Sequence, residues 1–437
     1  MEFYLFVHFG PNTFTDKEWG EGDEAVDIFN PSNLNCDQWC RIAKASGAKG
    51  IIITAKHHDG FCLWPSKYST HTVGESKWKN GRGDVLKELS TACKRHGLKF
   101  GVYLSPWDRN HHKYGTPGYN DVFVNMMKEI FKNYGPVWEF WWDGANGEGP
   151  NGKRQEYDWN RFEKTIRQLS PNTVVFSDIG PDIRWVGNEK GIAAGTNWNL
   201  LDTAGFKRGL GAPPNDTLQS GNVNGKNWIP AECDVSIRPG WFYHSKEDDK
   251  VKSAEELFQL YLKSVGRGAN FLLNVPPDRR GLINEHDSTA LVGFYRLRKE
   301  SFQKNLALTA KGSLTSQTGT KSAPRLNDGN PTSFETVVKA NLMQLKFEKS
   351  TSINCIILRE YLNKGQQVKN FRILLMDGEN NLIKEINAST VGRKRILTFP
   401  STPVKSIAIS IDDQKNSATI SEVEAYLIDE NLIERKD

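Results

Sequence analysis

The chain has 437 residues, too many for one small core, so two domains are the default expectation. Its charge is balanced, with 57 Lys and Arg against 52 Asp and Glu, and the basic residues are dispersed along the sequence. This pattern argues against nucleic acid as a partner, because nucleic-acid-binding proteins gather basic residues on one face. We also expect no membrane span, since no stretch is long and apolar enough to cross a bilayer.

Aromatic residues and cysteines give two further indications. The chain contains 13 Trp, 12 Tyr and 22 Phe. Abundant Trp is typical of proteins that handle carbohydrate, although a large aromatic core would give the same count. The cysteines show no CxxC motif and no zinc-type spacing, so we predict that all six are small buried hydrophobic residues. They are Cys36, Cys40, Cys62, Cys93, Cys233 and Cys355.

The amino-terminal end has no recognisable signal peptide. Residues 2–7, EFYLFV, already have the pattern of a core strand. We therefore expect a leader to be missing from this sequence and the protein to be periplasmic or secreted. The oligomeric state is left open.

The first 300 or so residues alternate between strand-like and helix-like patterns. Apolar, β-branched runs predict strands at residues 3–9, 50–54, 99–104, 137–142, 173–177, 228–233 and 271–275. Helical periodicity predicts helices at residues 36–46, 84–95, 121–132, 159–169, 254–265 and 285–304. Such alternation predicts an α/β fold, a (β/α)8-like barrel of the TIM type. Only seven strands are clear, and the Gly- and Asn-rich residues 191–227 predict a long loop or a broken barrel element, so an irregular barrel is also expected.

From about residue 311 the pattern changes to short strands separated by polar turns. The strand-like runs lie at residues 342–347, 353–359, 371–376, 396–399, 406–411 and 422–428. They predict an all-β sandwich. We place the catalytic barrel at residues 1–305 and the sandwich at residues 306–437.

One stretch organises the functional interpretation, the sequence AKHHDGFCLWP at residues 55–65. It directly follows the buried strand at residues 50–54, so His57, His58 and Asp59 lie at the carboxyl end of that strand. Active sites of (β/α)8 barrels are built at this end. Taken alone, the histidine pair fits a sugar site, a metal site or two loop histidines satisfied by the protein.

The other strand ends make the sugar site the best interpretation. Six of them deliver an aromatic residue together with a carboxylate or an imidazole to the same rim, which packing does not explain. In chain order these residues are His8, Glu18, Trp19, His57, His58, Asp59, Tyr103, Trp107, Asp108, Trp141, Asp143, Asp178, Glu189, Glu232, Asp234, Arg238 and Trp241.

The chemistry of this rim favours glycoside hydrolysis. No GxSxG, GxGxxG or P-loop motif is present, so neither a serine nucleophile nor a nucleotide cofactor is indicated. Glycosidases need one carboxylate as nucleophile or base and another as acid. Asp143 is the best nucleophile candidate, because it ends an aromatic strand and precedes Gly144. For the acid, the residues alone make Asp178, Asp182 and Glu232 candidates comparable to Glu189, although Asp178, at a strand end, fits better as a residue that orients its neighbours.

Several stretches of the barrel resemble a known family. They are FVHFGPNTFTDKEWGEG, GIIITAKHHDGFCLWPSKYSTHTV, GVYLSPWDRN, EFWWDGANG, GPDIRWVGNEKG, AECDVSIRPGWFYH and GANFLLNVPPDRRGLI. Spread over residues 3–283, they resemble the α-L-fucosidases of glycoside hydrolase family 29, in particular the subfamily selective for α-1,3/1,4-linked fucose.

The resemblance implies an exo-acting, retaining α-L-fucosidase that acts on fucosylated oligosaccharides or glycoconjugates. It implies Asp143 as the nucleophile and Glu189, in the loop after the fifth strand, as the acid/base. It also implies that no metal or cofactor is needed, so the histidines bind hydroxyl groups. The expected substrate-binding residues are His8, Glu18, Trp19, His57, His58, Tyr103, Trp141, Arg238 and Trp241.

Three alternatives remain beside this interpretation. The chain could be a broad-specificity α-L-fucosidase, a catalytically silent fucose-binding relative, or a barrel glycosidase for another sugar such as α-galactose. The sandwich resembles the discoidin-type domains that follow such barrels. Because no Trp occurs beyond Trp241, we expect it to pack against the barrel rather than to bind sugar independently.

Overall fold

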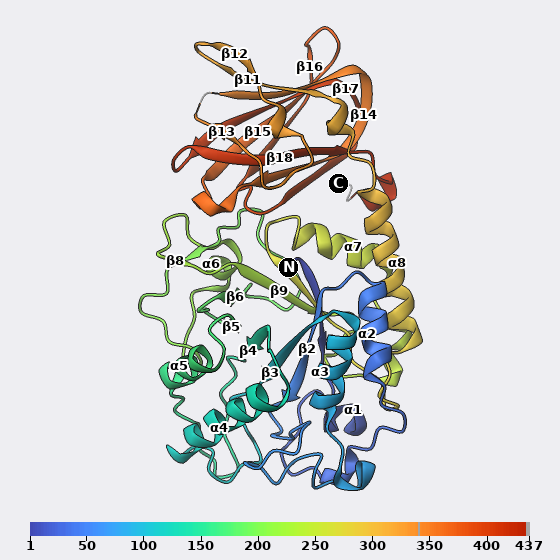
Figure 1. Ribbon diagram of the computed structural model, residues 1–437, viewed down its shortest axis with the longest axis vertical. Coiled ribbons are helices and arrows are strands. Elements are labelled where there is room, and N and C mark those ends of the chain that lie inside the picture. Colours follow the sequence, from blue (N-terminus) through green and yellow to red (C-terminus); the bar gives the residue numbers. More distant parts are fainter. Residues whose placement is uncertain (340, 434–437) are drawn as a thin grey trace.

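The computed structural model describes residues 1–339 and 341–433 and has two parts, arranged one above the other along the long axis (Figure 1). In the amino-terminal part eight parallel strands close into a barrel in the order β1-β10-β9-β6-β5-β4-β3-β2. Strand β1 pairs with both β2 and β10, so the sheet has no free edge. The predicted barrel is thus confirmed. Its strands are β1 (Phe3–Val7), β2 (Gly50–Lys56), β3 (Lys99–Leu104), β4 (Glu139–Trp141), β5 (Val174–Ser177), β6 (Ile183–Trp185), β9 (Ala231–Ser236) and β10 (Asn270–Asn274).

Strand β6 is the barrel strand that the sequence pattern did not reveal. It has only three residues, and no helix lies between it and β5. Instead the chain turns back at once, and the Asp182 side chain accepts a hydrogen bond from the backbone N–H of Val175 at 2.8 Å. The Asp182 N–H in turn donates to the Val175 carbonyl at 3.2 Å. A carboxylate therefore helps to replace the usual crossover.

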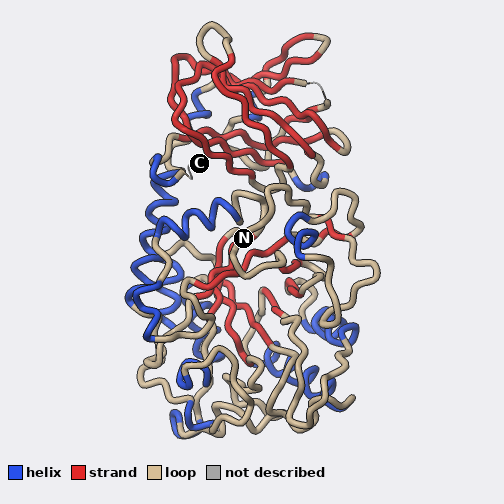
Figure 2. The backbone as a smooth tube through the Cα atoms, turned by 180° about the vertical axis from the view of Figure 1, so that it is seen from behind, coloured by secondary structure: helices blue, strands red, loops and turns tan. Residues whose placement is uncertain are grey.

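Helices surround the barrel (Figure 2). The α3 helix shows why they form where the sequence predicts them. The Asp84 side chain caps its first turn by accepting from the Lys87 N–H, and Gly97 ends it with φ 65°. No helix of the described residues has the length and apolar character needed to cross a membrane. The helices are α1 (Pro11–Thr15), α2 (Cys36–Ala45), α3 (Val85–His96), α4 (Gly118–Asn133), α5 (Trp159–Leu169), α6 (Asn215–Ser220), α7 (Ala254–Lys263) and α8 (Glu285–Ser301).

The predicted long loop at residues 191–227 is confirmed. It contains only the short α6 and the strand β7 (Leu200–Leu201), which pairs with β8 (Asn227–Trp228) outside the barrel. The strand predicted at residues 228–233 is displaced to β9. The six cysteines all lie in the described part of the chain and are buried and free, as predicted.

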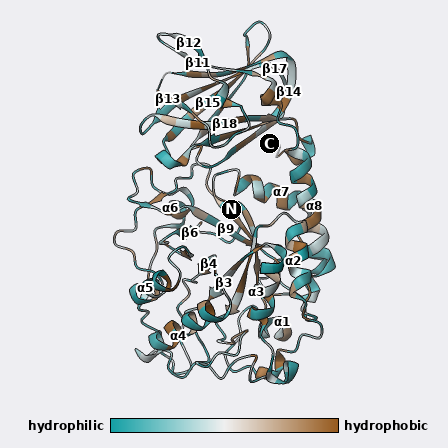
Figure 3. Cartoon of the chain, viewed as in Figure 1, coloured by the Kyte–Doolittle hydropathy of each residue, from teal (hydrophilic) through white to brown (hydrophobic). Residues whose placement is uncertain are grey.

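Side chains alternate between the two faces of the barrel wall. On β1, Tyr4 and Phe6 pack in the barrel interior, whereas Phe3, Leu5 and Val7 pack in the layer between strands and helices. Figure 3 shows the barrel strands as largely hydrophobic inside a more hydrophilic outer layer. The interior is not entirely apolar, because polar residues occupy the inward positions of several strands.

The carboxyl-terminal part is an antiparallel sheet of eight strands around one hydrophobic core, consistent with the predicted sandwich. Two pairs of predicted strands are continuous, since residues 342–347 and 353–359 both belong to β14, and residues 396–399 and 406–411 both belong to β17. The pairing register between these two strands shifts in two places. The boundary at residues 305/306 stays a prediction. The strands are β11 (Lys311–Ser316), β12 (Gly319–Ser322), β13 (Glu335–Val337), β14 (Leu342–Glu360), β15 (Val368–Met376), β16 (Leu382–Ser389), β17 (Arg395–Gln414) and β18 (Ala418–Tyr426).

This domain packs against the amino-terminal end of the barrel, as expected. Arg393 donates to the Ala269 carbonyl at 2.8 Å, just before β10, and Lys394 donates to Glu2 at 2.8 Å, just before β1. Ile357 and Tyr426 of this domain belong to the same apolar cluster as the outer layer of the barrel. The sheet domain therefore lies opposite the carboxyl ends of the barrel strands.

The shared cluster predicts that the two parts unfold together. Replacing Ile357, which is buried in it, by Ala should cost about 2–5 kcal/mol because a cavity is left at the interface. Calorimetry should show one transition at a lower Tm. The control is Ile383→Ala on β16, a side chain that is 44% exposed and should cost less than about 0.5 kcal/mol. Two separate transitions, with the barrel transition unchanged, would contradict the shared core.

Candidate functional site

The carboxyl ends of the barrel strands meet at a cavity of about 200 Å³. Pockets for drug-sized ligands span about 300–1,000 Å³, so this one suits a single sugar ring. Of the catalytic and substrate-binding residues implied by the family resemblance, all except Arg238 line it. The lining residues are Phe6, His8, Glu18, Trp19, His57, His58, Tyr103, Trp141, Asp143, Ala145, Glu189, Asp234 and Trp241.

Asp143, two residues after the end of β4, is held at both carboxylate oxygens. The Tyr103 hydroxyl donates to Oδ2 at 3.0 Å, and the Ala145 N–H donates to Oδ1 at 2.7 Å. Burial, followed by the nearby Asp143 charge, raises the pKa of Tyr103 well above its usual value, so Tyr103 stays a donor. The Asp143 side chain is nevertheless 26% exposed. A carboxylate that is fixed and still accessible meets the geometric requirement for a nucleophile.

His8 is a neutral imidazole with a defined tautomer. The Asn274 amide nitrogen donates to Ser236 Oγ at 2.9 Å and to the Trp241 carbonyl at 2.8 Å, so Asn274 Oδ1 must be an acceptor. His8 Nδ1 therefore donates to it, at 2.9 Å, and Nε2 is left as the acceptor nitrogen. Burial lowers the pKa of His8 to about 3, so the ring is uncharged at neutral pH.

The histidine pair is also neutral. The hydroxyl of Ser105 donates to the Trp107 carbonyl at 2.9 Å, so His58 Nδ1 donates to Ser105 Oγ, at 2.8 Å. His58 Nε2 lies 3.9 Å from Asp143 Oδ2, which is too long for a hydrogen bond. Burial lowers the pKa of His58 to about 4 and that of His57 well below its usual value. Neutral imidazoles suit the hydroxyl groups of a neutral ligand.

Glu189 lines the cavity and accepts a hydrogen bond from Trp241 Nε1 at 3.1 Å. Its place along the barrel corrects the prediction. Because β6 lies between β5 and this residue, Glu189 follows the sixth barrel strand and not the fifth.

The other acid candidates lie outside the cavity lining. Asp182 forms an ion pair with Arg167 at 2.7 Å. Glu232 is fully buried and accepts hydrogen bonds from Tyr4 and Trp141. The Asp178 carboxyl lies against Gly144, and burial, followed by the Asp143 charge, raises its pKa to about 6.

Asp234 was predicted at the rim but not among the catalytic or substrate-binding residues, and it lines the cavity. It is buried, and its Oδ1 has no hydrogen-bond partner among the described residues. Burial, followed by the nearby Glu189, raises its pKa well above the usual value, which favours the neutral carboxyl. The alternation of side chains along a strand could have indicated its inward position, because Glu232, Asp234 and Ser236 are alternate residues of β9.

Glu18 has a second role besides lining the cavity. Its carboxylate accepts from the backbone N–H groups of Trp241 at 2.7 Å and Phe242 at 3.2 Å. It also contacts His244 Nε2 at 2.7 Å, and His244 Nδ1 contacts Asp16 at 2.6 Å. Glu18 and His244 thus anchor the loop that carries Trp241. His244 is a residue that the sequence reasoning did not identify.

The prediction for Arg238 is wrong in its placement. The side chain is only 1% exposed, and its Nε donates to Asp287 of α8 at 3.0 Å. Its Nη1 forms an ion pair with Asp248 at 2.8 Å, and the guanidinium lies 4.7 Å from the Tyr243 ring centre. Arg238 therefore ties the loop after β9 to the barrel and does not line the cavity.

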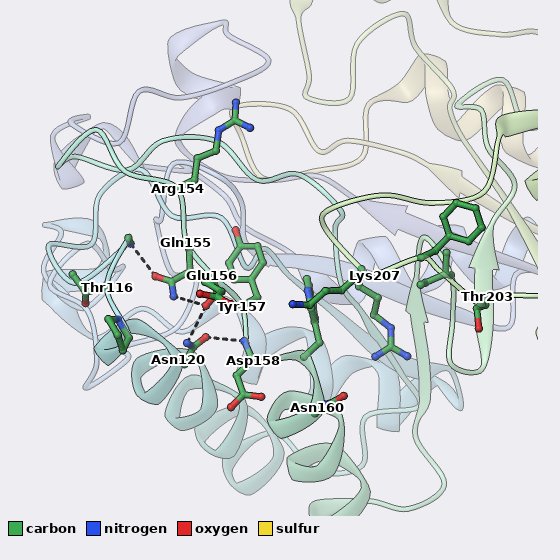
Figure 4. Close-up of a pocket in the computed structure, with 16 residues that line it drawn as sticks. Thr116, Asn120, Arg154, Gln155, Glu156, Tyr157, Asp158, Asn160, Thr203 and Lys207 are labelled. Carbon is green, nitrogen blue, oxygen red and sulfur yellow. Dashed lines mark hydrogen bonds between the residues drawn. The ribbon is translucent and has the colours of Figure 1, made fainter.

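Two further cavities are larger, and Figure 4 shows the side chains that line one of them. A cavity of about 730 Å³ lies between residues 115–120, 154–160 and 203–208, and an adjoining one of about 610 Å³ reaches Gly144 and Asp178 beside the nucleophile candidate. Hydrogen bonds order the wall of the larger of these two cavities. Gln155 accepts from the Gly115 N–H at 2.8 Å, and Asn120 donates to the Glu156 carbonyl at 3.1 Å.

Comparisons with known proteins agree on one family. The sequence profile described as Alpha-L-fucosidase matches residues 6–295. The chain is 42% identical to Alpha-L-fucosidase 1 of Arabidopsis thaliana over 435 residues, which cover 97% of this chain and 84% of that protein. It resembles the crystal structure of SpGH29 with a TM-score of 0.92 and 35% identity, covering 98% of this chain and 96% of that one. A GH29 fucosidase of Ruminococcus gnavus in complex with fucose aligns with a TM-score of 0.88 and 29% identity over 99% of this chain and 94% of that one.

The His244 contacts predict a pH-dependent anchor. Burial disfavours the charged ring, but the hydrogen bonds to Asp16 and Glu18 outweigh it and raise the pKa of His244. The stability that His244 contributes is therefore full below its unfolded pKa of about 6.5 and is lost as pH rises through the higher folded value. The Tm difference between wild type and His244→Asn should shrink between about pH 6 and pH 9. A difference that stays constant over this range would contradict the assignment.

Proposed function

Because this chain belongs to the α-L-fucosidase family, it is a glycoside hydrolase, and we propose that it releases terminal fucose with retention of configuration. The observation that supports this mechanism is the shared cavity of Asp143 and Glu189. Of the other carboxyl groups there, Glu18 is bound by the loop that it anchors, and Asp234 is only 3% exposed. Asp143 and Glu189 are therefore the pair available for catalysis.

The proposed reaction is a double displacement. The Asp143 carboxylate attacks the anomeric carbon while Glu189 donates its proton to the departing glycosidic oxygen, which gives a covalent fucosyl ester. Glu189 then removes a proton from water, which attacks the same carbon and releases Asp143 as a carboxylate. The Tyr103 hydroxyl stabilises this carboxylate through its hydrogen bond.

The cavity supports fucose as the sugar. The neutral imidazoles of His8, His57 and His58 can bind its hydroxyl groups without an uncompensated charge. Phe6 and Trp141 supply an apolar wall, with the Trp141 ring stacked on Phe176 at 3.9 Å. Such a wall suits the methyl group of fucose better than the hydroxymethyl group of galactose, so the galactosidase alternative is disfavoured.

For the substrate, we propose branched, Lewis-type glycans with α-1,3- or α-1,4-linked fucose, met in a periplasmic or extracellular location. The cavity of about 610 Å³ supports this proposal, since it reaches Gly144 beside the nucleophile candidate and has room for a further sugar. Its polar lining, with Asn146, Arg154 and Lys207, suits hydroxyl groups. A broad-specificity fucosidase is the second candidate. A catalytically silent relative is disfavoured because both proposed catalytic carboxyl groups line the cavity.

Asp143→Ala tests the nucleophile. Removing a covalent nucleophile should lower kcat on an aryl fucoside by about a thousandfold or more. Azide should restore part of the turnover by attacking the opened face of the sugar. The control is Asp178→Asn, the neighbouring carboxyl, which should lose far less activity. An Asp143→Ala variant that keeps more than about a tenth of wild-type turnover would exclude the assignment.

The linkage preference is tested by comparing kcat/KM across three substrates. We expect a Lewis-type trisaccharide to be cleaved fastest, because its branching galactose can be bound in the transition state. An aryl fucoside, which lacks the branch, should be slower, and an α-1,2-linked fucoside should be the poorest substrate. Equal or faster cleavage of the α-1,2 linkage would instead support the broad-specificity alternative.

A further inference from the structure

A chain of hydrogen bonds runs through the barrel interior below the site. It begins at Trp141, which lines the cavity and donates from Nε1 to Glu232 Oε1 at 3.0 Å. The second oxygen, Glu232 Oε2, accepts from the Tyr4 hydroxyl. Both Tyr4 and Glu232 are fully buried. The wall of the cavity is therefore bonded to residues on the axis of the barrel.

The chain continues to the other domain. Asn270 donates from Nδ2 to the Tyr4 hydroxyl at 3.2 Å, and Arg393 donates from Nη1 to Asn270 Oδ1 at 3.0 Å. Arg393 lies just before β17 and also donates to the carbonyls of Met1 and Ala269, both at 2.8 Å. Four hydrogen bonds thus connect the cavity wall to a cation of the carboxyl-terminal domain.

The direction of each bond is fixed by its neighbours. Because Arg393 can only donate, Asn270 Oδ1 must be the acceptor and its amide nitrogen must face Tyr4. The Tyr4 hydroxyl accepts from Asn270, so its own proton goes to Glu232. Without Arg393 the Asn270 oxygen would be left with no donor, and the amide could turn over and break the next bond.

Glu232 needs these donors. Burial raises its pKa to about 7, and burial together with the nearby Glu232 raises the pKa of Glu139 well above its usual value. Both carboxylate oxygens of Glu139 are buried, with no hydrogen-bond partner outside this pair among the described residues. A charge on Glu232 is therefore stabilised mainly by Tyr4 and Trp141. The position of the Trp141 indole consequently depends on the hydrogen bonds that hold Glu232 from the other side.

The position of Trp141 matters for the reaction. Its ring stacks on Tyr103, with centroids 5.4 Å apart and an interplanar angle of 30°. The Tyr103 hydroxyl in turn donates to Asp143. A displaced indole would therefore change both the cavity wall and the donor that orients the nucleophile.

We propose that Arg393 is a positioning residue for catalysis, acting from the carboxyl-terminal domain through Asn270, Tyr4 and Glu232 on Trp141. The proposal rests on the fucosidase mechanism with Asp143. It makes the sheet domain part of the catalytic unit, beyond its packing role. The neighbouring interface residues are not part of this series of hydrogen bonds, since Lys394 donates to Glu2 and Arg395 donates to the Gly195 carbonyl at 2.6 Å.

The test compares Arg393→Gln with Arg395→Gln in the full-length protein. Both variants lose an interface cation of the same type, so both should lower Tm. On an aryl fucoside well below Tm, Arg393→Gln should lower kcat about three- to tenfold with KM changed less than about twofold. Arg395→Gln should keep wild-type kcat. Equal kcat values for the two variants would overturn the proposal.

Tyr4→Phe gives a second test that leaves the interface intact and serves if Arg393→Gln does not fold. It should reproduce the loss in kcat. The double variant with Arg393→Gln and Tyr4→Phe should be no slower than the slower single variant, because both substitutions interrupt the same series of hydrogen bonds. Multiplying losses, or a Tyr4→Phe variant with wild-type kcat, would overturn the proposal. A wild-type chain that does not cleave the fucoside would overturn the proposed function itself, whereas these comparisons concern only the role of Arg393.

Discussion

The pairing of β1 with both β2 and β10 is the constraint on which the site depends. Leu5 lies beside Ile51 on one neighbour and beside Leu273 on the other, and all three side chains are fully buried. Closure makes all eight strands parallel neighbours, so their carboxyl ends share one rim. Residues as distant in sequence as His8 and Trp241 are thereby brought to one cavity. The same closure turns alternate side chains inward, where Tyr4 and Glu232 meet.

The cavity combines rigidity with a lack of permanent positive charge. Burial keeps the three imidazoles neutral, and the contacts of Asn274 and Ser105 fix which ring nitrogen carries the proton on His8 and His58. Asp143 is held by two donors and remains open to the cavity. Such preorganised donors need not rearrange during the reaction, which is the usual source of electrostatic catalysis.

The sequence predicted most of the barrel because buried β-branched strands and capped helices have strong local patterns. Strand β6 could not be predicted in this way, since three residues show no period and Asp182 replaces a crossover helix. In the sheet domain, β14 and β17 run through polar bends that the local pattern predicts as turns. These differences depend on tertiary contacts that a local pattern does not contain.

The site residues differ, for the same reason, in how far the sequence could indicate them. Asp143 could be inferred from its place at the end of an aromatic strand, whereas Glu189 was selected only by the family resemblance. The inward direction of Asp234 follows from the strand period, since it shares a face of β9 with Glu232. Arg238 was misplaced because a loop sequence does not reveal that Asp248 and Asp287 bind its guanidinium.

The central claim, that Asp143 forms a covalent bond to the sugar, is tested most directly by trapping that bond. A 2-deoxy-2-fluoro-α-L-fucosyl donor with a good leaving group slows hydrolysis of the ester more than its formation. Mass spectrometry of the digested protein should then find one fluorofucosyl group on the peptide that contains Asp143. A label on the peptide of Asp178 or Glu189, or a product of inverted configuration with no labelled peptide, would contradict the account.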